Sequence, residues 1–386
     1  MFGNKLEKLH ELYKSFVPTH WRTRARWVWG IALVSAILWT QFLHTGDAPL
    51  TVYFFDVGQG DGYLIRTAQG FDVLVDGGPT DKIVEKLGRV MPFWDKDIEL
   101  MILTHPHADH VTGLIEVLKR FQVKHVLATG VLHTTDEYLL WLKEIKEKNI
   151  PMTIAKARQV WTLSHSAALS PTKSALGFPC EETGACAQPS SSAVADAMPA
   201  GLPQHFCCEP SPRSGFAESK LEILYPEEIF EGERVVEGKT GEGGGLNDTS
   251  IVAKLTYGNT SFLLMGDATS AVEEQLLQEY NANQRISCQS TNTNSQFVDL
   301  NKICKFALQS DVLKVGHHGS KYSTSREFLK IVQPKYSVIQ VGKNRYGHPA
   351  YATLYRLKQA GVEVLRNDQD GDVVFESDGK GVRIAK

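Results

Sequence analysis

A six-residue stretch from His105 to His110, with the sequence HPHADH, constrains this chain more than any other feature. It holds three imidazoles and one carboxylate, a density that helix capping alone does not explain. An apolar run of strand length precedes it at residues 98–104, and residues 112–120 carry apolar side chains at helical spacing. The stretch therefore lies in a loop between a strand and a helix, where its side chains can converge. Imidazole and carboxylate together suit Zn²⁺, Mn²⁺ or iron, so we interpret it as a metal site.

The length and composition are those of a globular chain with a substantial core. The 386 residues, of which 42% are hydrophobic and 22% charged, suffice for one large domain or two ordinary ones. The net charge is −3, so the chain lacks the overall basic character of many nucleic-acid-binding proteins. This balance disfavours tight nonspecific DNA binding. It does not exclude catalysis on phosphodiesters, because bound divalent ions would supply the positive charge.

The N-terminal part combines a basic segment, residues 1–26, with an uncharged apolar segment, residues 27–43. The apolar segment is at the short end of what spans a bilayer, and tryptophans near both of its ends suit the membrane interfaces. The preceding arginines predict a cytoplasmic N-terminus. A secretory signal peptide and a buried helix are alternatives, but the basic region is long and no small-residue cleavage pattern follows. We expect a single-pass membrane anchor, with the rest of the chain outside the cytoplasm.

Short strands and helices alternate across residues 50–386, which is typical of an α/β domain. Two stretches interrupt the pattern: residues 164–219 are rich in Ser, Ala, Pro and Gly, and residues 281–304 are polar. We interpret both as inserts that are accessory to catalysis. All six cysteines lie in them, which permits disulfides in an exported domain, although the sequence leaves the pairing open.

Three further segments place polar side chains at the ends of apolar runs. Asp267 follows one such run, His317 and His318 follow another, and Asn247 and Asp248 precede a third. Ligands gather beyond strand ends in α/β sheets, so these side chains can complete the site begun by the histidine stretch. Two ions that share one carboxylate are a common hydrolytic arrangement, because they lower the pKa of a water and clamp the attacking and leaving oxygens.

Six motifs, taken together and in this order, resemble the metallo-β-lactamase superfamily. They are DVGQGD at 56–61, VDGG at 75–78, HPHADH at 105–110, MGD at 265–267, LKVGHHGS at 313–320 and GHP at 347–349. The first and fifth motifs narrow the resemblance to the hydrolase domain of ComEC-type DNA-uptake (competence) proteins and its free-standing relatives. The resemblance covers about residues 50–160, 220–280 and 305–386. It leaves out the anchor and both inserts.

The resemblance implies an αββα sandwich with two divalent metal ions, Zn²⁺ or Mn²⁺, at one edge. Carried over by motif, His105 and His107 would bind the first ion, and Asp109 and His110 the second. Asp267 would bridge the two ions. Asp109 is also a candidate for a direct part in catalysis.

The remaining motif-derived ligand comes from the pair His317 and His318. His318 is the expected metal ligand, because it is the one followed by Gly-Ser, and His317 would then lie behind it or near the substrate. The chain departs from the wider superfamily at the first ion's third ligand. Many members have a histidine there, whereas this chain has Asn247 and Asp248. Asp248 could bind the ion or be an ordinary turn residue, and the first site could be completed by water.

Other residues are candidates for contact with the substrate or the ligands. His348 is either a turn histidine or a donor that stabilises charge on a phosphoryl or leaving oxygen. Ser320 could contact a phosphate in the same region. Asp61 and Asp76 belong to the shared motifs and are expected behind the ligands or near the substrate.

The sequence therefore predicts a membrane-anchored, metal-dependent hydrolase whose outward-facing domain spans residues 50–386. Through a metal-activated water it would cut phosphodiester bonds, with DNA as a candidate substrate; no protein partner is predicted. Two alternatives stay open: a hydrolase of β-lactams, lactones or thioesters, and a non-catalytic module that binds metal structurally.

Overall fold

The computed structural model describes residues 27–33, 35, 48–165, 170–173, 217–233, 245–289 and 308–385. The chain divides into two compact units, residues 1–48 and 49–386. In the first unit, residues 27–33 and 35 are helical. Among the residues just given, we find no helix with the length and apolar character that crossing a bilayer requires. Residues 34 and 36–43 of the expected anchor lie outside the described residues, so the anchor stays a prediction.

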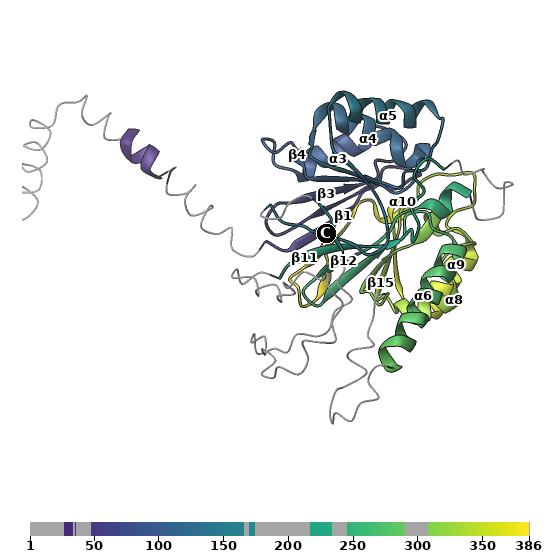
Figure 1. The fold of residues 1–386 in the computed structure, drawn as a ribbon. Coiled ribbons are helices and arrows are strands. Elements are labelled where there is room, and N and C mark those ends of the chain that lie inside the picture. Colours follow the sequence, from purple (N-terminus) through teal and green to yellow (C-terminus); the bar gives the residue numbers. More distant parts are fainter. Residues whose placement is uncertain are drawn as a thin grey trace, which may run out of the picture. The chain divides into compact units, whose positions relative to one another are not determined.

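The second unit is built on two eight-stranded sheets (Figure 1). In spatial order, the first sheet consists of β18 (Val382–Ala385), β17 (Val373–Ser377), β1 (Leu50–Phe54), β2 (Tyr63–Arg66), β3 (Asp72–Val75), β5 (Leu100–Leu103), β7 (Val126–Ala128) and β8 (Met152–Ile154). Its last four strands are parallel, and the others are antiparallel. A separate parallel pair joins β4 (Asp97–Ile98) to β6 (Gln122–Val123).

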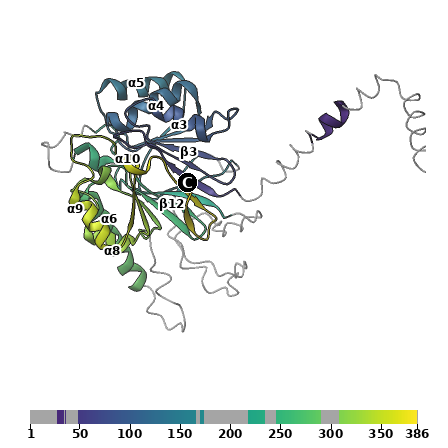
Figure 2. The same ribbon diagram turned by 180° about the vertical axis from the view of Figure 1, so that it is seen from behind.

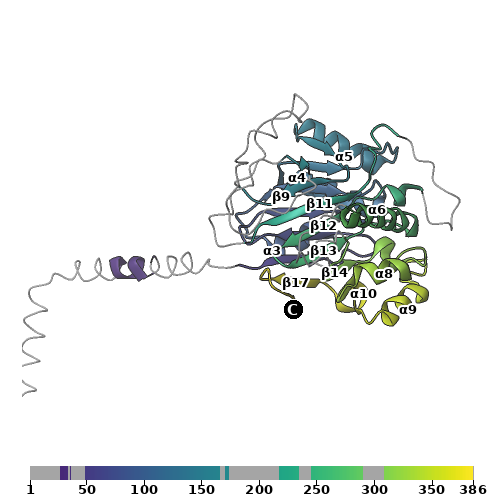
Figure 3. The same cartoon turned by 60° about the horizontal axis from the view of Figure 1, so that its bottom comes forward.

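The second sheet also has eight strands, and it too combines antiparallel with parallel strands. In spatial order it consists of β10 (Thr172–Lys173), β9 (Gln159–Thr162), β11 (Ser219–Tyr225), β12 (Val252–Tyr257), β13 (Thr260–Leu264), β14 (Val312–Lys314), β15 (Tyr336–Ile339) and β16 (Glu363–Arg366). Strands β13 to β16 are parallel. Figure 3 shows β11 to β14 side by side in this sheet.

Helices form the two outer layers (Figures 1 and 2). The first sheet is covered by α3 (Lys82–Val90), α4 (Ala108–Arg120) and α5 (Asp136–Glu147), and the second by α6 (Ser270–Gln289), α8 (Arg326–Val332) and α9 (Tyr351–Gln359). Short helical turns are η2 (Gly245–Thr249), η3 (Gly316–Gly319) and α10 (Asn367–Asp370). One buried apolar cluster lies between the sheets and one under each helical layer. The expected αββα order of layers is confirmed.

Parts of both expected inserts form regular secondary structure. Helix α6 continues to Gln289, so residues 281–289 belong to a helix rather than to a polar loop. Within the first insert, β10 pairs with β9. Residues 174–216 and 290–304 lie outside the described residues, with five of the six cysteines; the sixth, Cys288, is on α6. Their pairing therefore stays open.

Two glycines allow helix α4 to approach the turn that follows β3. The Gly77 amide donates a hydrogen bond to the His110 carbonyl at 2.8 Å, and the Gly113 amide donates to the Gly78 carbonyl at 3.0 Å. A Cβ atom on Gly113 would lie only 1.9 Å from the Gly77 carbonyl oxygen. This close backbone contact fixes the first turns of α4, and therefore the position of the histidine stretch, against the sheet.

Replacing Gly113 with alanine should lower the free energy of unfolding by about 2–3 kcal/mol, because the new methyl group would meet rigid backbone. The matched control is Gly88→Ala in α3, where a Cβ atom would have no neighbour within 4 Å. That change should leave stability unchanged or raise it by up to about 1 kcal/mol through helix propensity. Urea unfolding followed by circular dichroism checks both values. Equal effects of the two substitutions would contradict the contact argument.

Candidate metal centre

The predicted ligands lie where parallel strands of both sheets end. His105 lies two residues beyond β5, and His110 is in the first turn of α4. From the other sheet, Asp267 lies three residues beyond β13, and His318 is in η3 directly after β14. Side chains beyond the carboxyl ends of strands are the usual lining of a site in an α/β fold. The structure therefore brings together residues that are more than 150 positions apart in the sequence.

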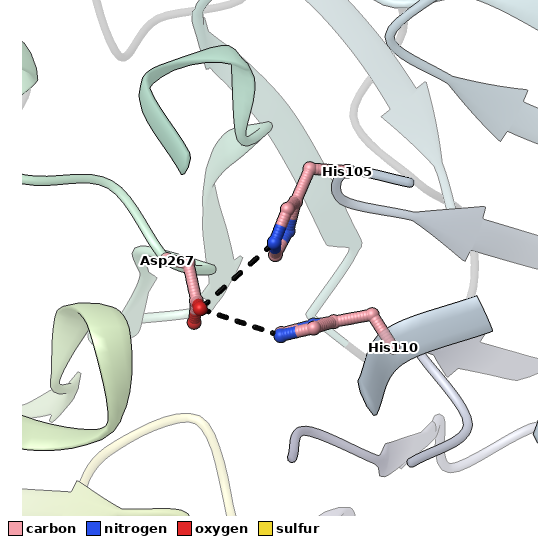
Figure 4. Close-up of side chains that lie close together, drawn as sticks. All are labelled: His105, His110 and Asp267. Atoms are coloured by element: carbon pink, nitrogen blue, oxygen red, sulfur yellow. Dashed lines mark ion pairs between the residues drawn. The ribbon is translucent and has the colours of Figure 1, made fainter. Parts of the chain in front are cut away.

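The Asp267 carboxylate is the centre of this cluster. Its Oδ2 atom lies 3.4 Å from His110 Nε2, 3.3 Å from His318 Nε2 and 3.9 Å from His105 Nε2. Figure 4 shows the His105 and His110 rings pointing at it. Asp109 completes the group, with Oδ2 lying 3.4 Å from His318 Nε2. Asp267 thus faces imidazoles from both halves of the fold, and its role as a bridging ligand stays a prediction.

The donor set fits a divalent metal. Several of its buried atoms, His110 Nε2, His318 Nε2 and Asp267 Oδ1, have no hydrogen-bond partner. Leaving a buried polar atom unpaired costs about 1–3 kcal/mol, so the side chains do not form a closed network by themselves. Four sets of three ligand atoms within 4.8 Å of one another could each hold an ion: His105, His110 and Asp267; Asp109, His110 and His318; Asp61, Asp76 and His110; and Asp61, Asp267 and His318. Nitrogen and oxygen donors of this kind suit Zn²⁺ or Mn²⁺.

Groups behind the ligands hold two of the imidazole rings in place. His110 Nδ1 lies 2.8 Å from Asp76 Oδ2, and Asp76 also accepts hydrogen bonds from the amide and hydroxyl of Thr104, at 2.9 Å and 2.7 Å. His318 Nδ1 donates to the Gln340 carbonyl at 2.9 Å. Since Nδ1 of each ring is engaged in this way, Nε2 is the atom presented to the cluster. Such support behind metal ligands fixes ring orientation and tautomer.

Burial and charge together set the protonation of these protein groups. Burial lowers the pKa of His110, but Asp267 and Asp76 raise it, and it ends well above its usual value. Burial also lowers the pKa of His318, but the carboxylates of Asp267, Asp61 and Asp109 together raise it well above its usual value. Burial raises the pKa of Asp267, but both imidazoles hold it well below its usual range. Burial, reinforced by the charge of His110, lowers the pKa of His105 well below normal.

Two of the predicted ligands lie outside the four ligand sets. The His107 ring contacts His105, with Nδ1 at 2.9 Å from His105 Nε2. The Asp248 carboxylate accepts a hydrogen bond from the Thr269 hydroxyl at 2.5 Å. The neighbouring Asn247 is the residue that turns towards the cluster, with its Nδ2 atom 3.3 Å from His317 Nε2. The ligand roles of His107 and Asp248 stay predictions.

The rings of His318, His317 and His348 contact one another in that order, beginning at the cluster. His317 and His318 have φ values of 48° and 51°, a left-handed conformation that is uncommon for residues other than glycine. Strain of this kind gathers at functional sites. The His348 ring lies 5.2 Å from the His317 ring, and burial, with the positive charge of both histidines, lowers the pKa of His348 to about 4. The Ser320 hydroxyl lies within its own turn, where it accepts from the Tyr322 amide at 3.3 Å.

Lys314 is a buried residue of the site that was not among the residues predicted from the sequence. Its ammonium group forms an ion pair with the Asp61 carboxylate and donates to the Gly266 carbonyl at 2.7 Å. The other Asp61 oxygen lies 3.3 Å from His318 Nδ1. A buried charge needs a partner, so a lysine inside an apolar strand was itself a signal that an acidic group lies opposite. Lys314 thereby balances the charge of a carboxylate that lies directly behind the ligands.

Comparison with known proteins agrees with the motif-based resemblance. A family model described as the metallo-beta-lactamase superfamily matches residues 55–343. ComE operon protein 3 of Bacillus subtilis is 28% identical over 184 residues, which cover 45% of this chain and 20% of that protein. Competence protein ComA of Neisseria gonorrhoeae is 32% identical over 141 residues, covering 36% of this chain and 17% of that protein. The match thus spans a fifth or less of the length of these curated relatives.

Among solved structures, the metallo-beta-lactamase fold protein YhfI from Bacillus subtilis aligns over 86% of this chain and 100% of its own. The identity is 11% and the TM-score 0.40. Family membership rests on the family model, which matches well over half of the chain. The chain therefore belongs to the metallo-β-lactamase superfamily of metal-dependent hydrolases, and within it the resemblance to competence proteins is confirmed.

Proposed function

We propose that this chain is a metal-dependent phosphodiesterase that acts on nucleic acid. The observation that carries the proposal is the buried cluster around Asp267, in which histidine and aspartate atoms from both sheets face one another without hydrogen-bond partners. The names of two relatives support a role connected with DNA, because one is called Competence protein ComA and the other Recombination protein 2.

We assign the ligands to two divalent ions, Zn²⁺ or Mn²⁺. His105 and His107 would hold the first ion, with Asp248 as a further candidate. Asp109, His110 and His318 would hold the second ion, and Asp267 would lie between the two ions. All of the assigned residues except His107 and Asp248 belong to the four ligand sets described above. When bound, such ions lower the pKa of a water and neutralise charge on phosphoryl oxygens.

Side chains of the protein perform the remaining tasks. Asp76 and the Gln340 carbonyl orient the rings of His110 and His318. The Asp109 side chain, 32% exposed, is the carboxylate of the cluster open to solvent, so it is placed to orient a reacting water. His348 is neutral at pH 7, because its pKa is lowered to about 4, and as a neutral imidazole it can donate to a phosphoryl or leaving oxygen.

We further propose that residues 27–43 anchor the chain in a membrane, with residues 1–26 in the cytoplasm and the domain 50–386 outside it. The uncharged apolar segment and its tryptophans support this arrangement. In this arrangement the hydrolase would meet substrates that arrive from outside the cell.

The full chain, loaded with Mn²⁺ or Zn²⁺, should hydrolyse both an unstructured DNA oligonucleotide and bis-p-nitrophenyl phosphate. His110→Ala should reduce kcat/KM by at least about 100-fold, because it removes a ligand and the partner of Asp76 and Asp267. The matched control is His165→Ala, which removes an exposed histidine that pairs with Glu99 away from the cluster. Its activity should equal that of the wild type.

Two outcomes would overturn the proposal in favour of an alternative. Turnover of nitrocefin or an acyl-lactone without any turnover of phosphodiesters would assign the chain to the lactam and ester hydrolases. One tightly held ion per chain, measured by elemental analysis and accompanied by no hydrolysis of any of these substrates, would favour a binding module.

Asp76→Ala should weaken Zn²⁺ or Mn²⁺ binding by about 10- to 100-fold, because Asp76 accepts from His110 and Thr104 and so fixes the ring of a proposed ligand. Isothermal titration calorimetry on the full chain measures the affinity. Asp368→Ala, which removes a surface carboxylate paired with Arg366, is the matched control and should leave the affinity unchanged. Equal affinities for wild type and Asp76→Ala would show that Asp76 does not orient the ligand.

A further inference from the structure

The loop from Gly342 to Ala350 is held rigidly beside the candidate metal centre. At its start, the Gly342 amide donates to Gln59 Oε1 at 3.3 Å; at its end, the Ala350 amide donates to the Gly319 carbonyl at 2.8 Å. Asn344 braces the middle, because its side chain accepts from the amides of Tyr346 and His348 and donates to two carbonyls. Whatever this loop presents to solvent is therefore fixed relative to the cluster.

The loop exposes the aromatic ring of Tyr346, which packs one face on a neighbouring ring and leaves the other face open to solvent. The Tyr346 side chain is 76% exposed, and its ring stacks on His348 at 5.9 Å between centroids and 23° between planes. His348 in turn lies 5.2 Å from His317, which lies 6.2 Å from the candidate ligand His318. A chain of rings thus leads from the cluster to a solvent-facing tyrosine.

The charged residues that neighbour Tyr346 in the sequence are all basic. Residues 342–359 contain four basic residues and no acidic one: Lys343, Arg345, Arg356 and Lys358. Lys343 and Arg345 are exposed and form no ion pair with any residue in the described part of the chain. A second exposed aromatic pair follows at the start of α9, where Tyr351 and Tyr355 stack at 6.2 Å. Since the whole chain has a net charge of −3, this is a local concentration of positive charge.

Exposed aromatic rings next to unpaired cations are the combination that binds single-stranded nucleic acid. The rings stack on bases, and the cations contact the phosphates between them. Stacking of this kind requires a base with a free face, which a strand has and the interior of a duplex does not.

We propose that Tyr346, with Lys343 and Arg345, forms a base-stacking subsite for a single-stranded nucleic acid whose scissile phosphate lies at the metal centre. This inference rests on the phosphodiesterase function proposed above. The base next to the scissile phosphate lies on the free face of Tyr346, and the two cations contact the backbone on either side. The subsite sets substrate preference and does not take part in bond cleavage.

The test compares wild type and Tyr346→Ala on an unstructured thymidine oligonucleotide and on an abasic strand of the same length and charge, with Mn²⁺. Loss of one stacked base should raise KM for the thymidine strand by about tenfold, with kcat unchanged. On the abasic strand the two proteins should have the same KM, because no base is present to stack. Tyr346→Phe, which keeps the ring, should stay within about twofold of wild type on both strands.

Trp94→Ala serves as the control for an exposed aromatic residue elsewhere, since Trp94 is 73% exposed and lies in the loop between α3 and β4. It should leave KM unchanged on both strands. An unchanged KM for Tyr346→Ala on the thymidine strand, or an equal rise on both strands, would overturn the subsite. Failure of the wild type to cut either strand or bis-p-nitrophenyl phosphate would instead overturn the proposed function itself, so the two failures are distinguishable.

Discussion

The attraction between the buried Asp267 carboxylate and the imidazoles around it is the interaction on which the site depends. His105 and His110 come from the first sheet and its helix α4, whereas Asp267 and His318 follow strands of the second sheet. The cluster therefore joins the two halves of the sandwich at one edge. Behind it, the ion pair between Asp61 and Lys314 joins the same two halves again. Charges buried this deeply are tolerated because each one meets a partner of the opposite sign.

The position of the site follows from the sheet topology. Parallel strands of both sheets end at this edge, and the segments that follow β5, β13 and β14 carry His105, Asp267 and His318. Glycines at Gly77 and Gly113 bring α4 close enough for His110 to reach Asp76 and Asp267 at the same time. On the second sheet, the left-handed backbone of η3 turns the histidine pair towards the cluster and the neighbouring loop.

Predictions from the sequence succeeded where a dense polar motif adjoins an apolar run of regular periodicity. The histidine stretch between a strand and a helix and the aspartate after the β13 run could be predicted, because apolar periodicity and dense polar motifs are local signals. The αββα order of layers was predicted from the resemblance to the metallo-β-lactamase superfamily, since periodicity alone indicated no more than an α/β domain. The pairing of Lys314 with Asp61, by contrast, joins residues 253 positions apart, and no local pattern specifies it. The same holds for Asn247, whose side chain faces His317 while Asp248 turns to Thr269. The extension of α6 to Gln289 was missed because its last turns are polar and lack the apolar stripe that marks a packed helix.

The central claim is that the cluster around Asp267 is a centre for divalent cations, and location of those cations tests it most directly. Crystals of the full chain soaked in MnCl₂ should show anomalous scattering peaks in contact with His110 Nε2, His318 Nε2 and the Asp267 carboxylate, and a second peak next to His105. Anomalous density elsewhere in the molecule but not between these side chains would contradict the account.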